Sequence, residues 1–536
     1  MSNTVYETFC KSAKEFPNNA FLCTPDYAGG SDNFVELTYG EMLARVDATA
    51  AAYRAAGYGP KHRVAVLLEN RPEFLMHFYA LNSLGAGLVP LNPDYRAAEL
   101  EYVLGHSGAT LVVALDKYKP LIDPASAKLG TVSTWYPESG AAMPAAKASL
   151  AADASPLPDE CALLDTSGTT GQPKGCVLSN RYFLRMAEVY LGEGGLCEVR
   201  RGVERLITPL PLFHMNALCA SAMAMLVSGG CIVQLDRFHP RRWWKDVAAS
   251  GATIVHYLGV MPAILLSLPP DPLDRAHTLR FGFGANADPR QITTFEERYG
   301  FPLIESWAMS ETGGGACITA SREPRHLGTR CIGTPGKWME LRLVDETDQD
   351  VPEGEPGELL VRRSGPDPRD GFFSCYLKDP AATDTAWRGG WFHTGDVARR
   401  GPDGQMHFVD RRKNIIRRSG ENIAALEVES VLQSHPEVDQ VAIVAVPDPV
   451  RDEEVFACIV ARNAGGKTEA VARSIQAYCL ERLAYFKAPG YVSFVETLPR
   501  TSTNKLQKGE AAKLGIELLK GGACFDLRDG KKRQAP

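Results

Sequence analysis

The chain has 536 residues, which is too long for a single hydrophobic core, so two or more domains are expected. Its composition is ordinary for a globular protein, and a net charge of −6 provides no basic field for nucleic acid. The thirteen cysteines form no CxxC pair, which favours reduced thiols in a cytoplasmic protein over disulfides or a zinc site. The N-terminal residues lack a signal-peptide pattern and no apolar run reaches about 18 residues, so no membrane anchoring is expected.

Helix and strand patterns alternate along the first part of the chain. Apolar residues at helical spacing predict a helix over Leu37–Ala55, and the apolar segment Arg63–Leu68 predicts a buried strand. The two patterns repeat at Glu73–Leu84, Leu88–Pro90, Glu99–Leu104 and Thr110–Ala114. Strands that alternate with helices indicate an α/β fold whose sheets are largely parallel.

The segment Leu163–Ser179, LLDTSGTTGQPKGCVLS, has apolar ends and a loop of small polar residues between them. Glycines let the backbone approach a ligand, hydroxyl and N–H groups donate, and lysine adds charge, so the loop suits phosphate. It is not a Walker A loop, because Pro173 and Gly175 flank Lys174. The residues expected at the phosphates are Thr166, Ser167, Gly168, Thr169, Thr170, Gly171 and Lys174.

The string TSGTTGQPKG resembles the phosphate loop of the adenylate-forming enzymes, a family that includes acyl-CoA synthetases, amino-acid adenylation domains and luciferases. Family members usually carry Tyr or Phe where this chain has Asp165. The resemblance implies a large N-terminal AMP-binding domain, residues 1–411, with parallel sheets and a β-rich subdomain. It also implies a small, mobile α+β C-terminal domain, residues 412–536.

Two segments are expected to hold the substrate acid. Arg205–His214, RLITPLPLFH, is similar to a family motif at the acyl-binding cleft, and its prolines hold it extended. Amino-acid adenylation domains usually have Asp where His214 stands, which disfavours an α-amino acid. Thr253–Pro262 is expected to form a strand and a turn at the same pocket; core packing is the alternative for its side chains and for His214. The residues expected to bound the pocket are His214, Asn216, His256, Gly313 and Gly314.

Two further segments are expected to hold adenosine. Leu279–Asp288 ends in a turn similar to the one that frames adenine in the family, with Asn286 in place of the usual Pro. Asp396 and Arg411 match the two family residues that hold ribose. The turn residues are Gly284, Ala285 and Asn286.

The string SWAMSET, Ser306–Thr312, looks like the family motif Tyr-Gly-x-Thr-Glu. Trp307 stands for the Tyr, Ser310 for the Thr, and Glu311 matches the Glu. An aromatic ring can stack on adenine, a hydroxyl can bond phosphate, and a carboxylate can hold Mg²⁺ that bridges phosphates. The resemblance therefore assigns these three roles to the three residues.

The segment Met406–Glu429 matches the family's boundary between domains. Lys413 falls at the hinge position, where the backbone rotates between two domain arrangements. Ser419, Gly420 and Glu421 match the loop that lines the coenzyme A entry in the second arrangement.

Near the C-terminus, Leu498–Lys508 reads LPRTSTNKLQK and is similar to Pro-Arg-Thr-x-x-Gly-Lys, with Asn504 for the Gly. Lys505 then matches the catalytic lysine of the family. The implied reaction has two steps: a small carboxylic acid and ATP give an acyl-adenylate, and the thiol of coenzyme A then gives an acyl-CoA. No nucleophilic serine elbow is present and none is required. Glu311, Ser310, Lys174 and Lys505 are the expected catalytic residues.

Three other functions share these motifs: loading of a separate carrier protein, a luciferase-like oxidase, and a nonenzymatic nucleotide sensor. The strings PLPLFHMNA, FVDRRKN and SGEN look most like the crotonobetaine/carnitine-CoA and medium-chain acyl-CoA ligase branch. A quaternary ammonium group would need aromatic or acidic neighbours, for which Phe213, Tyr257, Trp307 and Trp338 are candidates. A homodimer is a further expectation.

Overall fold

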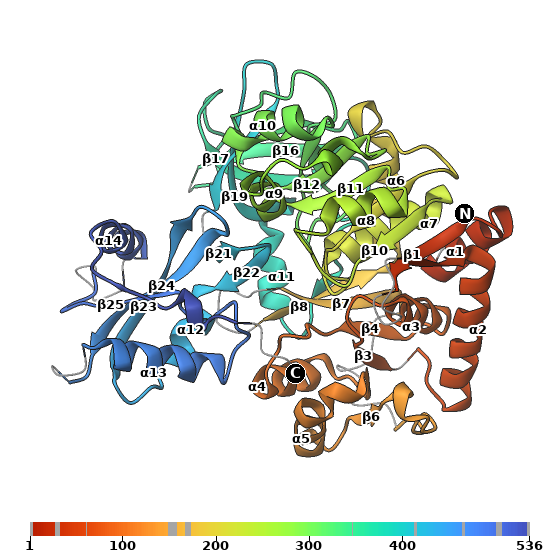
Figure 1. Ribbon diagram of the computed structural model, residues 1–536, viewed down its shortest axis with the longest axis horizontal. Coiled ribbons are helices and arrows are strands. Elements are labelled where there is room, and N and C mark those ends of the chain that lie inside the picture. Colours follow the sequence, from red (N-terminus) through yellow and green to blue (C-terminus); the bar gives the residue numbers. More distant parts are fainter. Residues whose placement is uncertain are drawn as a thin grey trace.

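The computed structural model describes residues 4–26, 33–60, 62–147, 158–166, 173–345, 347–411, 415–463, 467–499, 506 and 508–532. Figure 1 shows the C-terminal elements from β21 onward, in blue, beside a larger N-terminal region. One large hydrophobic core runs from Val5 to Met406, and two smaller ones begin at Ile416 and Ala442. The boundary expected between residues 411 and 412 falls where the first core ends and the second begins.

A seven-stranded sheet in the order β18-β8-β7-β4-β3-β5-β6 is described in the N-terminal region. Its strands β7, β4, β3, β5 and β6 are parallel neighbours, as the alternating pattern predicted. The strands are β3 (Arg63–Leu67), β4 (Gly87–Pro90), β5 (Leu111–Ala114), β6 (Ser133–Trp135), β7 (Glu160–Thr166), β8 (Lys174–Ser179) and β18 (Cys375–Tyr376). The accompanying helices are α1 (Val5–Glu15), α2 (Tyr39–Ala55), α3 (Pro72–Ser83), α4 (Ala97–Ser107) and α5 (Lys119–Leu129).

Local sequence explains how this sheet is framed. Helix α2 begins at a capping box in which Thr38 and Glu41 satisfy each other's backbone N–H groups. Strand β3 is buried along its whole length, as expected for a strand covered on both faces. Its Arg63 pairs with Glu160 of β7 at 2.6 Å, and both side chains are fully buried, which ties the two strands at one end.

A second sheet has thirteen described strands and joins the parallel core to a β-rich subdomain. Strands β1, β10, β9, β11, β12 and β13 are parallel, and from β14 to β16 the neighbours are antiparallel. The parallel part has β1 (Ala20–Pro25), β9 (Arg205–Thr208), β10 (Cys231–Gln234), β11 (Ile254–Leu258), β12 (Phe281–Ala285) and β13 (Leu303–Trp307), with β2 (Phe34–Thr38) antiparallel at its edge. The antiparallel part has β14 (Ile318–Thr319), β15 (Cys331–Pro335), β16 (Met339–Val344), β17 (Gly357–Arg363), β19 (Phe392–Arg400) and β20 (Met406–Arg411).

The helices that cover this sheet include one feature that the sequence did not predict. They are α6 (Asn180–Gly192), α7 (Ala222–Ser228), α8 (Trp243–Ser250), α9 (Val260–Ser267), α10 (Pro289–Tyr299) and α11 (Pro380–Ala386). A π-helical turn, η5 (Asn216–Ser221), precedes α7; such turns are rare and often occur at functional sites. The segment after β11 was expected to be a turn, but it begins α9, whose first turn accommodates Pro262.

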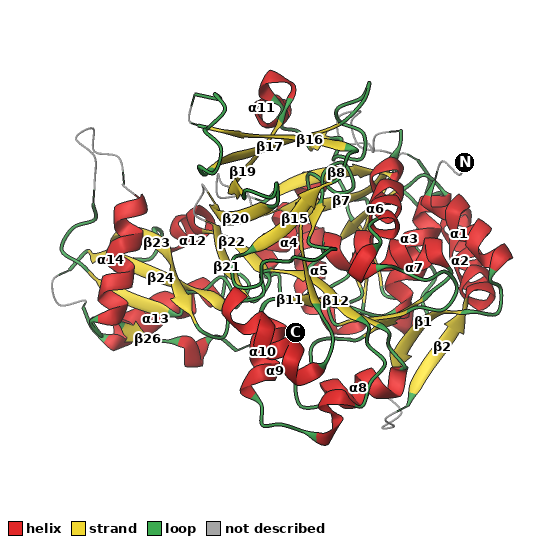
Figure 2. Cartoon of the chain, turned by 90° about the horizontal axis from the view of Figure 1, so that it is seen from above, coloured by secondary structure: helices red, strands yellow, loops and turns green. Residues whose placement is uncertain are grey.

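The C-terminal region contains six strands among its described residues, and strand alternation explains its two cores. Val441 and Ile443 belong to one core, while Ala442 and Val444 belong to the other. Figures 1 and 2 show helices α13 and α14 on opposite sides of β23 and β24. The elements are β21 (Ile415–Arg418), β22 (Glu421–Ala424), α12 (Ala425–Leu432), β23 (Val438–Asp448), β24 (Asp452–Ala461), α13 (Glu469–Leu480), β25 (Tyr491–Phe494), α14 (Lys508–Lys520) and β26 (Phe525–Asp526).

Two further observations concern the whole described chain. None of its helices combines the length and apolar composition that crossing a bilayer requires. All thirteen cysteines are free thiols and most of them are buried.

Candidate active site

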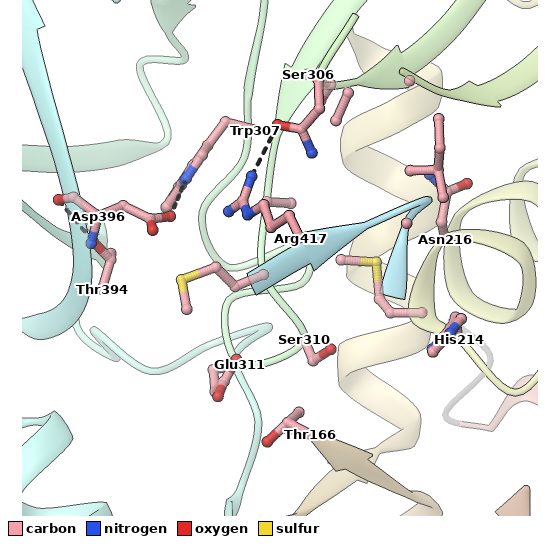
Figure 3. A pocket seen from close by; sticks show the side chains of 18 of the residues that line it. Thr166, His214, Asn216, Ser306, Trp307, Ser310, Glu311, Thr394, Asp396 and Arg417 are labelled. Carbon is pink, nitrogen blue, oxygen red and sulfur yellow. Dashed lines mark hydrogen bonds between the residues drawn. The ribbon is translucent and has the colours of Figure 1, made fainter. Parts of the chain in front are cut away.

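A cavity of about 900 Å³ opens where both large sheets meet the C-terminal region. The carboxyl ends of neighbouring parallel strands β9, β11, β12 and β13 all reach it, which is the usual ligand position in such sheets. Figure 3 shows part of its lining. Predicted site residues that line the cavity are Thr166, Lys174, His214, Asn216, Gly284, Ala285, Asn286, Trp307, Ser310, Glu311, Asp396, Ser419, Gly420 and Glu421.

The hairpin β7–β8 carries the two described ends of the predicted phosphate loop. Thr166 Oγ1 donates to the Lys174 carbonyl at 3.2 Å and closes the base of the loop. The ammonium group of Lys174 lies 4.9 Å from the ring centroid of Tyr376 and 3.5 Å from Asp379 Oδ2. Ser167, Gly168, Thr169, Thr170 and Gly171 lie outside the described residues.

Glu311 lies beside this hairpin, and it is 8% exposed. The Tyr376 hydroxyl donates to Glu311 Oε1 at 2.9 Å, while Oε2 bonds to no described residue. Burial and the Glu311 carboxylate raise the pKa of Tyr376 well above its ordinary value. Tyr376 therefore stays a donor and fixes the orientation of the carboxylate. Sequence reasoning missed Tyr376, because it reaches the site only through the short pairing of β18 with β8.

Trp307 and Asp396 meet on another wall of the cavity. The Trp307 indole N–H donates to Asp396 Oδ2 at 2.9 Å, as Figure 3 shows. Asp396 is 1% exposed and lies within β19, so it is a buried strand residue and not a surface carboxylate. Its register partner on β20 is Arg411, the second expected ribose residue.

The turn after β12 explains two residues of the predicted adenine frame. A Cβ on Gly284 would lie 2.2 Å from the Tyr257 carbonyl oxygen, so only glycine fits this close strand pairing. Asn286 has φ of +63°, which a proline ring cannot adopt, and this accounts for the departure from the usual Pro. Arg417 of the C-terminal region donates to Asn286 Oδ1 at 2.9 Å.

Glu305, which the sequence analysis did not single out, lies on the same wall. It accepts hydrogen bonds from the Tyr257 hydroxyl at 2.6 Å and from the Ala287 N–H at 3.2 Å. Burial raises the pKa of its carboxyl to about 7. Tyr257 is therefore committed to Glu305, although it was a candidate for contact with the substrate.

Three predicted residues of the acid pocket are not among the cavity's lining residues. His256 is fully buried and bonded to Tyr190 and Ser221, so the alternative of core packing holds for it. A Cβ on Gly313 would lie 2.1 Å from the Tyr182 ring, and one on Gly314 would lie 2.4 Å from the backbone of Arg185. The glycines are required because this turn packs against α6; they do not form a wall facing the acid.

The hairpin turn between β21 and β22 presents the predicted coenzyme A residues to the cavity. His214 Nε2 lies 3.4 Å from Glu421 Oε2, and Arg451 donates to the Ser419 hydroxyl at 3.1 Å. Gly420 has φ of +87°, and a Cβ there would lie 2.3 Å from Leu258 Cδ1. A glycine is needed at this point because the turn is left-handed and nearly touches the end of β11.

A buried ion cluster joins the two regions. Lys487 Nζ lies 2.7 Å from Glu99 Oε1 on α4 and 2.8 Å from Glu427 Oε1 on α12. Burial alone would lower the pKa of Lys487, but the two carboxylates outweigh it and raise the pKa. The cluster could not be found from the sequence, since each residue alone looks like an ordinary surface charge.

Two expected functional lysines cannot be placed. The hinge residue Lys413 and the catalytic residue Lys505 lie outside the described residues. The neighbours of Lys505 in the chain, Leu498 and Leu506, pack in the core between α14 and the C-terminal sheet. Figure 1 places α14 on the side of that sheet away from the larger region.

Comparison with known proteins identifies the family. Residues 9–377 match the model of the AMP-binding enzyme, and residues 427–505 match that of the AMP-binding enzyme C-terminal domain. A crotonobetaine/carnitine–CoA ligase of Proteus mirabilis is 30% identical over 490 residues, covering 88% of this chain and 92% of that protein. A malonyl-CoA ligase with methylmalonyl-CoA and AMP bound is 28% identical with a TM-score of 0.74, covering 90% and 97% of the two chains.

A mutant o-succinylbenzoate CoA synthetase from Bacillus subtilis shares the fold, with a TM-score of 0.80 and 24% identity over 94% of this chain and 98% of that chain. The large α/β region with its β-rich part and the small C-terminal region are thus the architecture that the sequence predicted. Both family models match this chain, and they cover the phosphate-loop hairpin and Glu311. The chain therefore belongs to the AMP-binding family of adenylate-forming enzymes.

Proposed function

We propose that this protein is an AMP-forming acid–CoA ligase that joins a small carboxylic acid to coenzyme A at the expense of ATP. The observation that carries the proposal is that one cavity gathers Thr166, Lys174, Glu311 and Asp396 with the Ser419–Glu421 turn. These residues come from four separated segments and both regions of the chain. Family membership supports the same reaction.

In the first step, a carboxylate oxygen of the acid attacks the α-phosphorus of ATP. The bond from that phosphorus to the bridging oxygen breaks, and pyrophosphate leaves with the electron pair. We assign Thr166 and Lys174 to the phosphates, Asp396 and Arg411 to the ribose, and Trp307 with the Gly284–Asn286 turn to the adenine. Negative charge accumulates in this step, so a nearby cation should lower its barrier.

The residues at Glu311 fit a magnesium ion. Tyr376 orients the carboxylate through Oε1, and Oε2 stays open toward the cavity, as a hard cation requires. Bound there, Mg²⁺ would neutralise phosphate charge. Glu311 would hold the ion and Ser310 would bond a phosphate oxygen.

In the second step, the sulfur of coenzyme A attacks the acyl carbonyl carbon. The bond from that carbon to the AMP oxygen breaks, AMP leaves, and the thiol proton passes to solvent. We propose that the described arrangement belongs to this step, because the Ser419–Glu421 turn borders the cavity while α14 lies away from it. Rotation about Lys413 would bring Lys505 to the phosphates for the first step.

The function is tested by measuring pyrophosphate release over a panel of carboxylic acids, with and without coenzyme A. We expect AMP, pyrophosphate and acyl-CoA as products, with turnover that requires Mg²⁺. Formation of ADP would contradict the proposal. The same assay on the separated cytoplasmic and membrane fractions of cells would test the proposed cytoplasmic location.

The proposed rotation is tested with Lys487→Met and Lys505→Ala, each assayed separately for the two steps. Lys487→Met leaves Glu99 and Glu427 buried without their cation, so thioester formation from supplied acyl-adenylate should fall by about 10²-fold. Lys505→Ala should instead reduce pyrophosphate release by about 10²–10³-fold. Lys513→Met, which breaks an exposed pair within the C-terminal region, is the control. Equal losses in both steps for both variants would refute the rotation.

A further inference from the structure

A chain of hydrogen bonds runs from the protein core to the acid side of the cavity. The Tyr190 hydroxyl lies 2.8 Å from His256 Nε2, and His256 Nδ1 lies 2.7 Å from Ser221 Oγ and 3.1 Å from Asn216 Oδ1. The Ser221 hydroxyl is also 3.1 Å from the Asn216 carbonyl oxygen. Asn216 and Ser221 are the two ends of the π-helical turn η5, which brings both beside the same imidazole.

The proton positions in this chain follow from counting donors and acceptors. Burial lowers the pKa of His256 to about 3, so its ring is neutral and has one donor and one acceptor. Burial also raises the pKa of Tyr190, whose hydroxyl has no described partner other than His256 Nε2. Tyr190 must therefore donate to Nε2, because otherwise its buried proton would have no acceptor. The ring proton is then on Nδ1.

This tautomer fixes the orientation of the Asn216 amide. The Nδ1–H group needs acceptors, and it faces Ser221 Oγ and the Asn216 side-chain oxygen. Ser221 can in turn donate to the Asn216 carbonyl, so the polar groups of Tyr190, His256 and Ser221 are all satisfied. The opposite tautomer would leave the Tyr190 proton without an acceptor and would set Nδ1 against the amide oxygen.

With its oxygen held by His256, Asn216 turns its NH₂ group the other way. Asn216 is half-buried and lines the cavity, and its Nδ2 atom has no hydrogen-bond partner among the described residues. Figure 3 shows Asn216 and His214 across the pocket from Asp396. The cavity lining includes the apolar side chains of Met186, Leu210, Phe213, Met215, Ala220 and Phe283, together with the polar pair His214 and Glu421. Phe283 also stacks on the His256 ring at 5.2 Å.

We propose that Asn216 is a specificity-determining residue that donates its amide N–H to a neutral oxygen on the acyl part of the acid, such as an oxo or ether oxygen. The inference rests on the proposed ligase function and adds the class of acid. An oriented donor among apolar lining residues favours an acid that carries a matching acceptor, since a substrate without it would leave the donor unpaired.

A trimethylammonio acid fits this wall poorly, because it brings a cation toward an N–H donor. Three of the four aromatic residues expected to surround such a cation make other contacts, and the fourth, Phe213, lines the cavity. Tyr257 donates to Glu305, Trp307 donates to Asp396, and Trp338 lies 4.4 Å from the Arg363 guanidinium. The specificity of this chain should therefore differ from the one named for its crotonobetaine/carnitine relatives.

The test compares matched acids on wild type, Asn216→Leu and Asn216→Asp. The pairs are hexanoate with 3-, 4- and 5-oxohexanoate, and benzoate with its three methoxy derivatives. For at least one pair, the wild-type kcat/KM in pyrophosphate release should favour the acid with the acceptor by about 10-fold. Asn216→Leu should abolish that preference, measured as the ratio of the two kcat/KM values within each pair. Asn216→Asp should reverse it, since a carboxylate oxygen would face the acceptor.

Cys219→Ala is the matched control, because Cys219 is a fully buried residue of the same π-helical turn and does not line the cavity. It should keep the wild-type preference, which separates loss of the donor from general disturbance of η5. An unchanged preference in Asn216→Leu, or a wild-type preference for the parent acid in every pair, would overturn the inference while leaving the ligase function intact. Absence of pyrophosphate release with every acid tested would overturn both.

Discussion

The two sides of the cavity are built from different kinds of groups. On the nucleotide side, Lys174, Glu311 and Asp396 bring formal charges to the surface of the cavity. On the acid side, Tyr190 and His256 are neutral and bonded to each other, and of this hydrogen-bonded chain the Asn216 amide is the part that lines the cavity, near the pair His214–Glu421. Burying an unpaired charge is costly, so charged side chains are favourable on the side where a charged nucleotide binds in every reaction. A neutral donor in an apolar wall can instead select among acids.

The largest effect is expected on the nucleotide side, from Glu311→Gln. The substitution removes a charge at nearly constant volume, and the new amide oxygen can still accept from Tyr376 at the 2.9 Å position. Pyrophosphate release should fall by about 10²–10³-fold, as when a preorganised electrostatic partner is lost. The melting temperature should stay near that of wild type. A variant that melts early would instead mark Glu311 as a structural residue.

A smaller effect, on stability, is expected from Gly314→Leu behind the acid side. A side chain there would meet the backbone of Arg185 and Met186 at 2.4 Å, so α6 must shift. The free energy of unfolding should fall by about 3 kcal/mol, the upper range for overpacked sites. Denaturant unfolding measures the loss, and the order of preferred acids should not change. A stable variant that accepts a narrower range of acids would contradict this expectation and would indicate that the turn borders the acid pocket.

The smallest effect is expected from Asp165→Asn, at the end of β7 between the two sides. Burial raises the pKa of this carboxyl to about 7, so between pH ~4 and ~7 the folded state binds more protons than the unfolded state. The free energy of unfolding of wild type should therefore fall as pH rises through this window. At pH 8 the variant should be more stable by on the order of 1 kcal/mol, and at pH 4 the two should be equal. If the unfolding free energies of wild type and variant differed by the same amount at every pH in this window, the raised pKa of Asp165 would be contradicted.

The sequence was most informative where a motif occupies one short segment. Thr166, Asp396 and the pair Trp307 and Glu311 come from three separate motifs, and all four residues line the cavity. Each motif is a short stretch of chain, so its residues reach the site together.

The acid side was harder to predict because its geometry depends on packing between distant elements. The position of His256 in β11 does not show which face of the strand it occupies. In the structure it points into the core, where it is hydrogen-bonded to Tyr190 of α6. Gly314 was predicted to form a wall of the acid pocket, whereas close contact with α6 is the reason that a glycine is needed there. Tyr376 and Lys487 act through contacts with residues far away in the sequence, which leave no periodic pattern or motif.

The central claim, an acyl-adenylate formed and consumed in this cavity, is tested most directly with an acid labelled with ¹⁸O in both carboxylate oxygens. The acid, ATP, Mg²⁺ and coenzyme A are incubated with the enzyme, and the ¹⁸O content of AMP and acyl-CoA is measured by mass spectrometry. Attack of the carboxylate on the α-phosphorus predicts one ¹⁸O in each AMP and one in each acyl-CoA. Unlabelled AMP, or label found in inorganic phosphate beside ADP, would contradict the account.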